Sequence, residues 1–161
     1  MLRRFRDVRG FTTTELMVGM VIVGILIAAS VPNLRSYRES QRMSSACDRI
    51  AAMCRTARAT ARAQNHQVII SYDTGNEEVV MHADANDDGI VDVGERVDRF
   101  PMPTGVFLDS STFTNDALVF NGRGRCVEGG SIIVEGHDHV DPKRIRVSAG
   151  TGQVKILGVD P

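Results

Sequence analysis

The sequence predicts an α+β fold in which one long amino-terminal helix packs on an antiparallel β-sheet. Up to Gln64, apolar side chains recur at helical spacing, first as a continuous run and then as a single stripe. Beyond Gln64, short alternating segments are separated by Gly, Asn, Asp and Pro, as expected of strands and turns. With 161 residues, 42% of them hydrophobic and 24% charged, the chain has room for this helix and one modest domain.

The first ten residues form a basic leader. Four arginines against a single aspartate place the amino terminus on the cytoplasmic side of a membrane. Residues 11–31 are mostly apolar, and as a helix they cover roughly 30 Å, the thickness of the hydrocarbon layer. We therefore expect a leader at residues 1–10 and a transmembrane helix at residues 11–31.

Glu15 distinguishes the interpretations of this segment. A cleaved secretory signal would use the weak small-residue site at residues 28–30, and a plain signal anchor would use the charges only to set topology. Neither explains Glu15, because a carboxylate within a membrane helix costs about 2.5 to 3.5 kcal/mol and usually marks function.

The order of Gly10, Phe11 and Glu15 before the apolar run resembles the class III signal of type IV prepilins, in the pilin and pseudopilin superfamily. The resemblance implies that prepilin peptidase cuts between Gly10 and Phe11 and methylates the new terminal residue, giving N-methylphenylalanine at Phe11. It also implies that Glu15 contacts the amino terminus of a neighbouring subunit and sets axial register in a filament. Thr12 to Thr14 depart from the more apolar residues of most members.

Residues 32–64 continue the helix in amphipathic form. An apolar stripe faces a core and intervening arginines face solvent. Residues 65–161 form the β-rich domain, and its last two strands form a hairpin. The predicted strands are 67–72, 77–81, 96–100, 106–108, 117–120, 131–135, 144–148 and 153–157.

This soluble part resembles the GspH/FimT family of minor pilins and pseudopilins. The resemblance rests on residues 58–65 leading into Val68, then a D-x-N-x-D-G loop, a Phe-x-Gly segment and a terminal strand pair. It implies a pilin-like fold and assembly with other subunits through the amino-terminal helix.

Residues 84–95 match the twelve-residue calcium-loop pattern D-x-N-x-D-G-x5-E. Strands rather than helices flank the loop, so it is no EF-hand, and ordinary Asx turns explain the same residues without a metal. No cofactor is required by the sequence, and calcium is the candidate. Its ligands would be Asp84, Asn86, Asp88, the Ile90 carbonyl, Asp92 and Glu95.

Three cysteines suggest a disulfide. Cys47 and Cys54 lie about 10.5 Å apart along one helix, beyond the reach of a bridge. In an oxidising compartment Cys126 could pair with Cys47 or with Cys54, and three reduced core cysteines are the alternative.

Arg123 and Arg125 lie in a glycine-rich segment that could grip phosphates. Some FimT-like proteins carry a Gly-Arg-x-Arg motif near the carboxyl terminus, but the corresponding stretch here, residues 152–155, lacks both arginines. A formal net charge of −1 and few aromatics give little general attraction to nucleic acid. Residues 137–139, His-Asp-His, form an exposed polar turn rather than a metal or catalytic site.

We expect a structural subunit rather than an enzyme, since no nucleophile elbow or phosphate loop is present in the sequence. The expected protein is a minor pilin or pseudopilin of a type II secretion pseudopilus or a type IV pilus. It would be a single-pass inner-membrane protein with a periplasmic carboxyl-terminal domain, and its partners would be other subunits, the peptidase and the inner-membrane assembly platform. The alternative is an anchored minor pilin that binds DNA or a substrate during DNA uptake.

Overall fold

The computed structural model describes residues 10–137 and 141–159, with the backbone alone for residues 30–36. The leader at residues 1–9 therefore lies outside the described residues. The chain divides into two compact units, one ending at Tyr37 and the other beginning at Arg38. One helix, α1 (Thr13–Gln64), contributes to both units.

The first unit contains the beginning of α1. Its large apolar side chains are exposed around the whole circumference of the helix, from 52% of the side chain at Ile22 to 70% at Met17. Among the described residues, no helical segment meets the length and hydropathy needed to cross a membrane.

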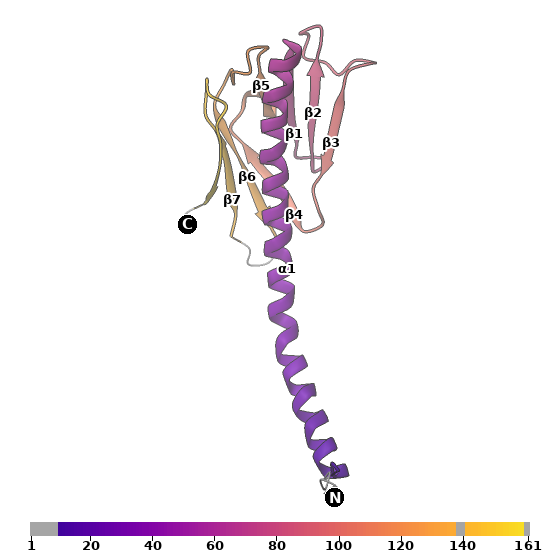
Figure 1. Cartoon of the computed structure of the whole chain (residues 1–161). Helices are drawn as coiled ribbons and strands as arrows, with labels where there is room; N and C mark the ends of the chain where they lie inside the picture. The colour runs from indigo at the N-terminus through magenta and orange to yellow at the C-terminus, as the bar shows by residue number, and fades with distance from the viewer. Residues whose placement is uncertain (1–9, 138–140, 160–161) are drawn as a thin grey trace, which may run out of the picture. The chain divides into compact units, whose positions relative to one another are not determined.

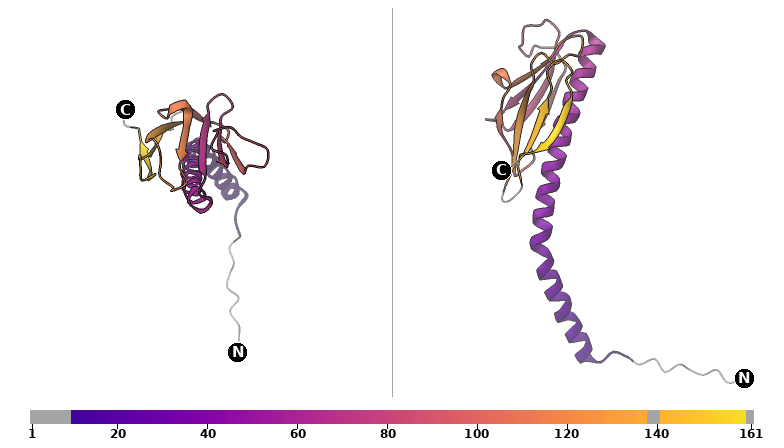
Figure 2. Two further views of the ribbon diagram at one scale, coloured as in Figure 1. Left: turned by 90° about the horizontal axis from the view of Figure 1, so that it is seen from above. Right: turned by 90° about the vertical axis from the view of Figure 1, so that its left-hand side faces the viewer.

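The second unit contains the rest of α1 and two antiparallel sheets (Figures 1 and 2). In the described residues each sheet has four strands, in the orders β3-β2-β1-β5 and β4-β6-β7-β8. A short 3-10 helix, η1 (Thr114–Asp116), precedes β5. The strands are β1 (Gln67–Asp73), β2 (Glu78–Asp84), β3 (Val97–Pro101), β4 (Val106–Ser111), β5 (Ala117–Phe120), β6 (Gly130–Gly136), β7 (Lys143–Val147) and β8 (Val154–Gly158).

The core lies where α1 packs against both sheets. The buried face of the helix repeats at spacings of three and four residues, as an amphipathic helix requires. Most of its members are alanine, cysteine or methionine. The members are Met43, Ala46, Cys47, Ile50, Met53, Cys54, Ala57 and Ala61. Opposite them, one sheet contributes Val68, Ile70, Val79, Leu118 and Phe120, and the other contributes Leu108, Ile132, Val134, Ile145 and Val147.

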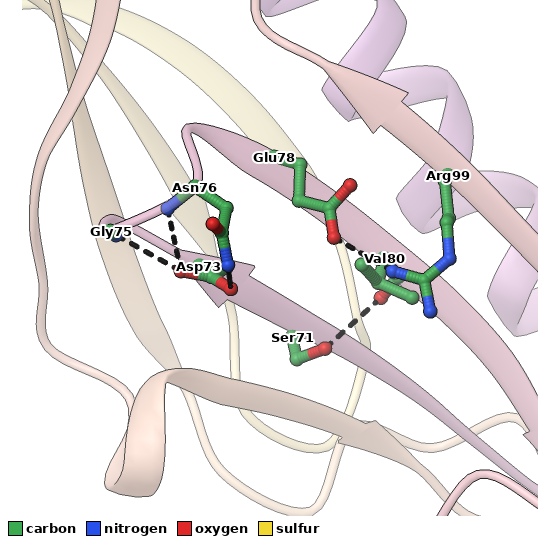
Figure 3. Close-up of polar contacts among 7 residues, drawn as sticks. All are labelled: Ser71, Asp73, Gly75, Asn76, Glu78, Val80 and Arg99. Atoms are coloured by element: carbon green, nitrogen blue, oxygen red, sulfur yellow. Dashed lines mark hydrogen bonds and ion pairs between the residues drawn. The ribbon is translucent and has the colours of Figure 1, made fainter.

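The β1–β2 turn is held by the side chain of Asp73 (Figure 3). Its carboxylate accepts hydrogen bonds from the backbone N–H groups of Gly75 and Asn76, both at 2.9 Å, and from Asn76 Nδ2 at 2.6 Å. The Asn76 side-chain bond, with the backbone bonds, lowers the pKa of Asp73. Glu78 and Arg99 form an ion pair at 2.7 Å that joins β2 to β3 in the same view.

The fold prediction is confirmed, and each predicted strand corresponds to an observed one with boundaries moved by at most a few residues. Two details differ. The strands divide between two sheets, and β2 continues to Asp84, so the first residue of the predicted calcium loop is a buried strand residue.

Phe120→Ala tests the core. The Phe120 ring is fully buried, and a Cβ placed on Gly152 would lie 2.7 Å from it, so the ring packs directly on that turn. We expect the free energy of unfolding to fall by about 3 to 5 kcal/mol. Phe107→Ala is the control, because Phe107 is 40% exposed, and we expect it to cost about 1 kcal/mol or less. Equal losses in chemical denaturation of the detergent-solubilised chain would contradict this core assignment.

Candidate functional site

Glu15 and Thr12 form a reciprocal cap on the first turn of α1. Thr12 donates to Glu15 Oε2 from its backbone nitrogen at 3.0 Å and from its hydroxyl at 2.9 Å. In return, the backbone N–H of Glu15 donates to the Thr12 hydroxyl oxygen at 3.3 Å. This is a capping box, in which a Thr and a Glu three residues later satisfy the free N–H groups of a helix start. The carboxylate therefore already has hydrogen-bond partners within its own chain.

The surface beside Glu15 is an apolar groove of about 450 Å³. Gly19 lies in the middle of it and leaves open space where a side chain would stand. Small residues on an apolar helix allow a second helix to approach closely. The flanking side chains are Phe11, Leu16, Met20 and Val23.

The loop at residues 84–95 closes on itself through hydrogen bonds. The buried Asp84 carboxylate accepts from the backbone N–H groups of Asp88 at 3.2 Å and Gly89 at 2.8 Å. Glu95 accepts from the N–H groups of Ala85 at 2.8 Å and Asp92 at 3.0 Å. Asp84 and Glu95, the first and last of the predicted ligands, therefore stabilise the closed conformation of the loop.

The middle of the loop brings polar side chains together around Asn86. Its amide nitrogen lies 2.9 Å from a carboxylate oxygen of Asp88 and 2.9 Å from one of Asp92. The backbone nitrogen of Ile90 donates to the other Asp88 oxygen at 2.8 Å. Within the described residues, no group of three or more His, Cys, Asp or Glu side chains is placed to hold a metal ion. The amide nitrogen of Asn86 therefore lies between two carboxylates, in the position that the cation would occupy in a calcium site.

Arg123 and Arg125 are exposed on the tight turn after β5. The Asn121 side chain organises this turn, since its Oδ1 accepts from the backbone N–H groups of both arginines at 3.1 and 3.0 Å. The Arg123 carbonyl accepts a hydrogen bond from Arg62 Nε on α1 at 3.2 Å. The turn and the helix therefore place arginines together, which the sequence spacing alone did not reveal.

The predicted disulfide is absent from the structure, in which Cys47, Cys54 and Cys126 are all free and buried. The sulfurs have other partners: Cys54 Sγ lies 3.9 Å from the Tyr72 hydroxyl, and Cys126 Sγ donates to the Glu128 carbonyl at 2.8 Å. Cys126 influences the pKa of Cys54, whereas Lys143 and Asp48 are the charged groups that influence Cys47. Of the two predicted pairs, Cys54 and Cys126 are therefore the neighbours.

Burial controls the chemistry of these thiols. It raises the pKa of Cys54 to about 12 and that of Cys47 to about 11, and it also raises the pKa of Cys126. The Tyr72 hydroxyl, buried beside Cys54, has a raised pKa for the same reason. Because the thiolate is the reactive form, none of these thiols is suited to act as a nucleophile in the folded protein.

One buried polar residue was not predicted. His82 on β2 is only 4% exposed, and neither ring nitrogen has a hydrogen-bond partner. It alternates with core residues along the strand and shares a face with Val80 and Asp84. In the predicted His-Asp-His turn, His137 donates its backbone N–H to the Gly105 carbonyl at 2.8 Å, and residues 138 and 139 lie outside the described residues.

A long helix packed on antiparallel sheets, with Glu15 in the first turn of an apolar helical segment, is the arrangement of type IV pilins and pseudopilins. Residues 46–151 match the family described as Type II transport protein GspH, and the chain belongs to that family. No match was found among curated proteins.

The solved structures that share the fold include a minor pseudopilin and a minor pilin. The minor pseudopilin EpsH from the Type 2 Secretion System of Vibrio cholerae is 10% identical, with a TM-score of 0.58 over 73% of this chain and 97% of that one. The type IV minor pilin FimU of Pseudomonas aeruginosa is 13% identical, with a TM-score of 0.57 over 77% of this chain and 92% of that one. At these identities the likeness shows the fold.

Thiol labelling tests the state of the cysteines. A rise in the Cys54 pKa to about 12 lowers its thiolate fraction at pH 8 roughly 1,000-fold relative to an ordinary thiol. We expect iodoacetamide to label the folded chain very slowly and to label all three cysteines after denaturation without reductant. Mass spectrometry counts the labels. Rapid labelling of folded Cys54 would contradict the burial argument, and a single label after denaturation would show that a disulfide had formed.

Proposed function

We propose that this chain is a structural subunit of a type II secretion pseudopilus or a type IV pilus, assembled through the first unit of α1. The proposal is supported most directly by the exposed apolar circumference of this unit together with Glu15 at its start. Apolar side chains that pack on nothing within their own subunit are suited to lipid before assembly and to neighbouring helices afterwards. In this role the chain performs no catalysis.

The proposed maturation begins with cleavage between Gly10 and Phe11 by prepilin peptidase and methylation of the Phe11 amino group. Phe11 is 88% exposed and precedes the capped turn, so the peptide bond before it is accessible. Residues 11–31 then anchor the subunit in the inner membrane, residues 32–64 continue the helix, and residues 65–161 complete the periplasmic domain. The inner-membrane platform transfers the subunit from lipid into the filament.

Glu15 would exchange one partner for another during assembly. In the free subunit the carboxylate accepts two hydrogen bonds from Thr12. In a helix bundle that excludes water, a carboxylate held only by neutral donors is poorly compensated, and a neighbouring cation offsets the cost. The amino terminus of another mature subunit supplies such a cation, and the groove at Gly19 leaves room for its helix.

Glu15→Gln and Thr12→Val separate charge from capping. Glutamine also serves at the third position of a capping box, so Glu15→Gln keeps the cap and removes the charge. Thr12→Val keeps the charge and removes the two hydrogen bonds of the Thr12 hydroxyl, leaving the bond from the backbone N–H of residue 12. We expect Glu15→Gln to lower incorporation into sheared filaments by about tenfold or more, because breaking a buried ion pair costs about 3 to 5 kcal/mol. Thr12→Val should have the smaller effect.

Immunoblots of membrane and filament fractions provide the measurement, with membrane levels as the control for stability. Normal incorporation of Glu15→Gln would contradict the ionic role of this residue. Equal defects in both variants would assign Glu15 to capping alone.

We also propose that the loop at residues 84–95 binds calcium weakly. Support comes from the two carboxylates that share the Asn86 amide donor, since a cation could take the place of that donor. Asp88, Asp92 and the side-chain oxygen of Asn86 would supply hard oxygen ligands, together with Asp84, Glu95 and the Ile90 carbonyl.

Calcium binding is tested by thermal unfolding with and without millimolar calcium, the affinity range of extracellular modules. We expect calcium to raise the midpoint of the wild-type chain and to leave Asp92→Asn unchanged, because the variant loses one charged ligand. Magnesium at the same concentration is the ionic-strength control. An equal shift of the midpoint with both ions, or no shift, would contradict calcium binding and indicate that the loop is an ordinary turn.

DNA binding through Arg123 and Arg125 is retained as the alternative. The exposure of both side chains on a hydrogen-bonded turn favours it. A mobility shift of DNA by the wild-type chain that disappears when both residues are alanine would support the alternative.

A further inference from the structure

A pocket lined by arginines lies beside the last strand of the domain. Its volume is about 380 Å³, and it is formed by one face of α1 and the turn that begins β8. The helix contributes Arg55, Arg58, Ala59 and Arg62, and the turn contributes Gly152, Gln153 and Val154. Three like charges within two helical turns repel one another, so an anion in this pocket would relieve that repulsion.

Two of the arginines are held in place through their inner nitrogens. Arg58 Nε donates to the Gly124 carbonyl and Arg62 Nε to the Arg123 carbonyl, both at 3.2 Å. Gly124 makes this possible, because a Cβ there would lie 2.5 Å from Arg62 Cγ. Across the described residues, the ion pairs are Arg49 with Asp98 and Arg99 with Glu78, so no carboxylate neutralises the pocket. Guanidinium groups fixed in this way are prepared for a carboxylate or another oxyanion.

The strand that starts at this pocket has an open edge. In the described sheet β8 pairs with β7 alone. Ser148 donates to the Gln153 carbonyl and Val159 donates to the Pro142 carbonyl, which fixes the alternation of the ladder. Alternate residues between these two hydrogen bonds therefore direct their backbone N–H and C=O groups away from β7. These residues are Val154, Ile156 and Gly158. Ile156 and Leu157 are also 37% and 40% exposed.

We propose that β8 and the arginine pocket together bind an extended acidic peptide segment from another protein chain. The segment adds as a further strand along the open edge of β8, and a carboxylate near one of its ends enters the pocket. Main-chain hydrogen bonds give such strand addition its affinity, and pockets beside the edge give it specificity. The continuity of the edge with the pocket at Val154 favours a peptide over nucleic acid, which has no backbone donors to pair with a strand edge.

Two matched pairs of variants separate the contributions of charge and edge. Arg55→Glu reverses an exposed charge of the pocket, and Arg42→Glu makes the same change at an exposed position elsewhere on the helix. Ile156→Pro removes an outward N–H while leaving the β7 ladder its bonds, and Ile156→Val keeps that N–H.

The experiment measures binding by fluorescence anisotropy with the full chain in detergent micelles, so it does not depend on filament incorporation. The probes are labelled Val-Thr repeat peptides that carry a Glu pair at either end, the same peptides with a Lys pair, and a single-stranded oligonucleotide. Inorganic phosphate is tested as a competitor. Circular dichroism and the unfolding midpoint confirm that each variant is folded.

We expect one of the Glu-ended peptides to bind. The Lys-ended peptides should bind at least about tenfold more weakly, because they cannot form charge-assisted hydrogen bonds with the arginines. Arg55→Glu and Ile156→Pro should each weaken binding about tenfold, and Arg42→Glu and Ile156→Val less than about twofold. No binding of either Glu-ended peptide, or equal effects of the paired variants, would overturn the proposal. Preferential binding of the oligonucleotide, or complete competition by phosphate with no loss in Ile156→Pro, would overturn it in favour of a simple anion site.

Discussion

Burial of a single face of α1 between two sheets is the constraint on which the second unit depends. The face consists largely of alanine and cysteine, with Met43, Ile50 and Met53 as its larger members, so β-strands from both sheets reach the helix. Small side chains contribute little apolar area each, and Phe120 and branched residues of the strands are among the largest fully buried side chains. The same packing encloses the thiols of Cys47, Cys54 and Cys126 in the core.

The same packing leaves arginines of α1 outside the core, on the other faces of the helix. Arginines that cannot enter the core lie along the edge of the packed region, where Arg58 and Arg62 meet backbone carbonyls of the turn after β5. An arginine face on a helix is ordinarily a solvated surface. Here the contact with a glycine-rich turn fixes two of its members, so a feature that serves solubility in many helices becomes a candidate recognition surface.

Much of the architecture could be predicted from the sequence because its local signals agree with the final fold. The switch from helical to alternating periodicity at Gln64 coincides with the end of α1, and the turn residues separate the strands as observed. The division into two sheets could not be predicted, since strand pairing depends on contacts between segments far apart in sequence. The free cysteines reflect the same limit: spacing excluded one pair but could not show that Cys54 faces Tyr72 and that Cys126 faces the Glu128 carbonyl.

The site at Glu15 was partly predictable. The position of Glu15 in an apolar helix indicated function, and Thr12 three residues earlier carried the capping-box signal that explains how the carboxylate is held in the free subunit. Because Glu15 is bonded to Thr12 within its own chain, the central claim of the proposed assembly is that Glu15 changes partner on entering the filament. The most direct measurement is a cryo-electron microscopy structure of filaments that contain this subunit. The account predicts a Glu15 carboxylate oxygen within about 4 Å of the amino-terminal nitrogen of a neighbouring subunit. A carboxylate still bonded only to Thr12, with no cation beside it, would contradict the account.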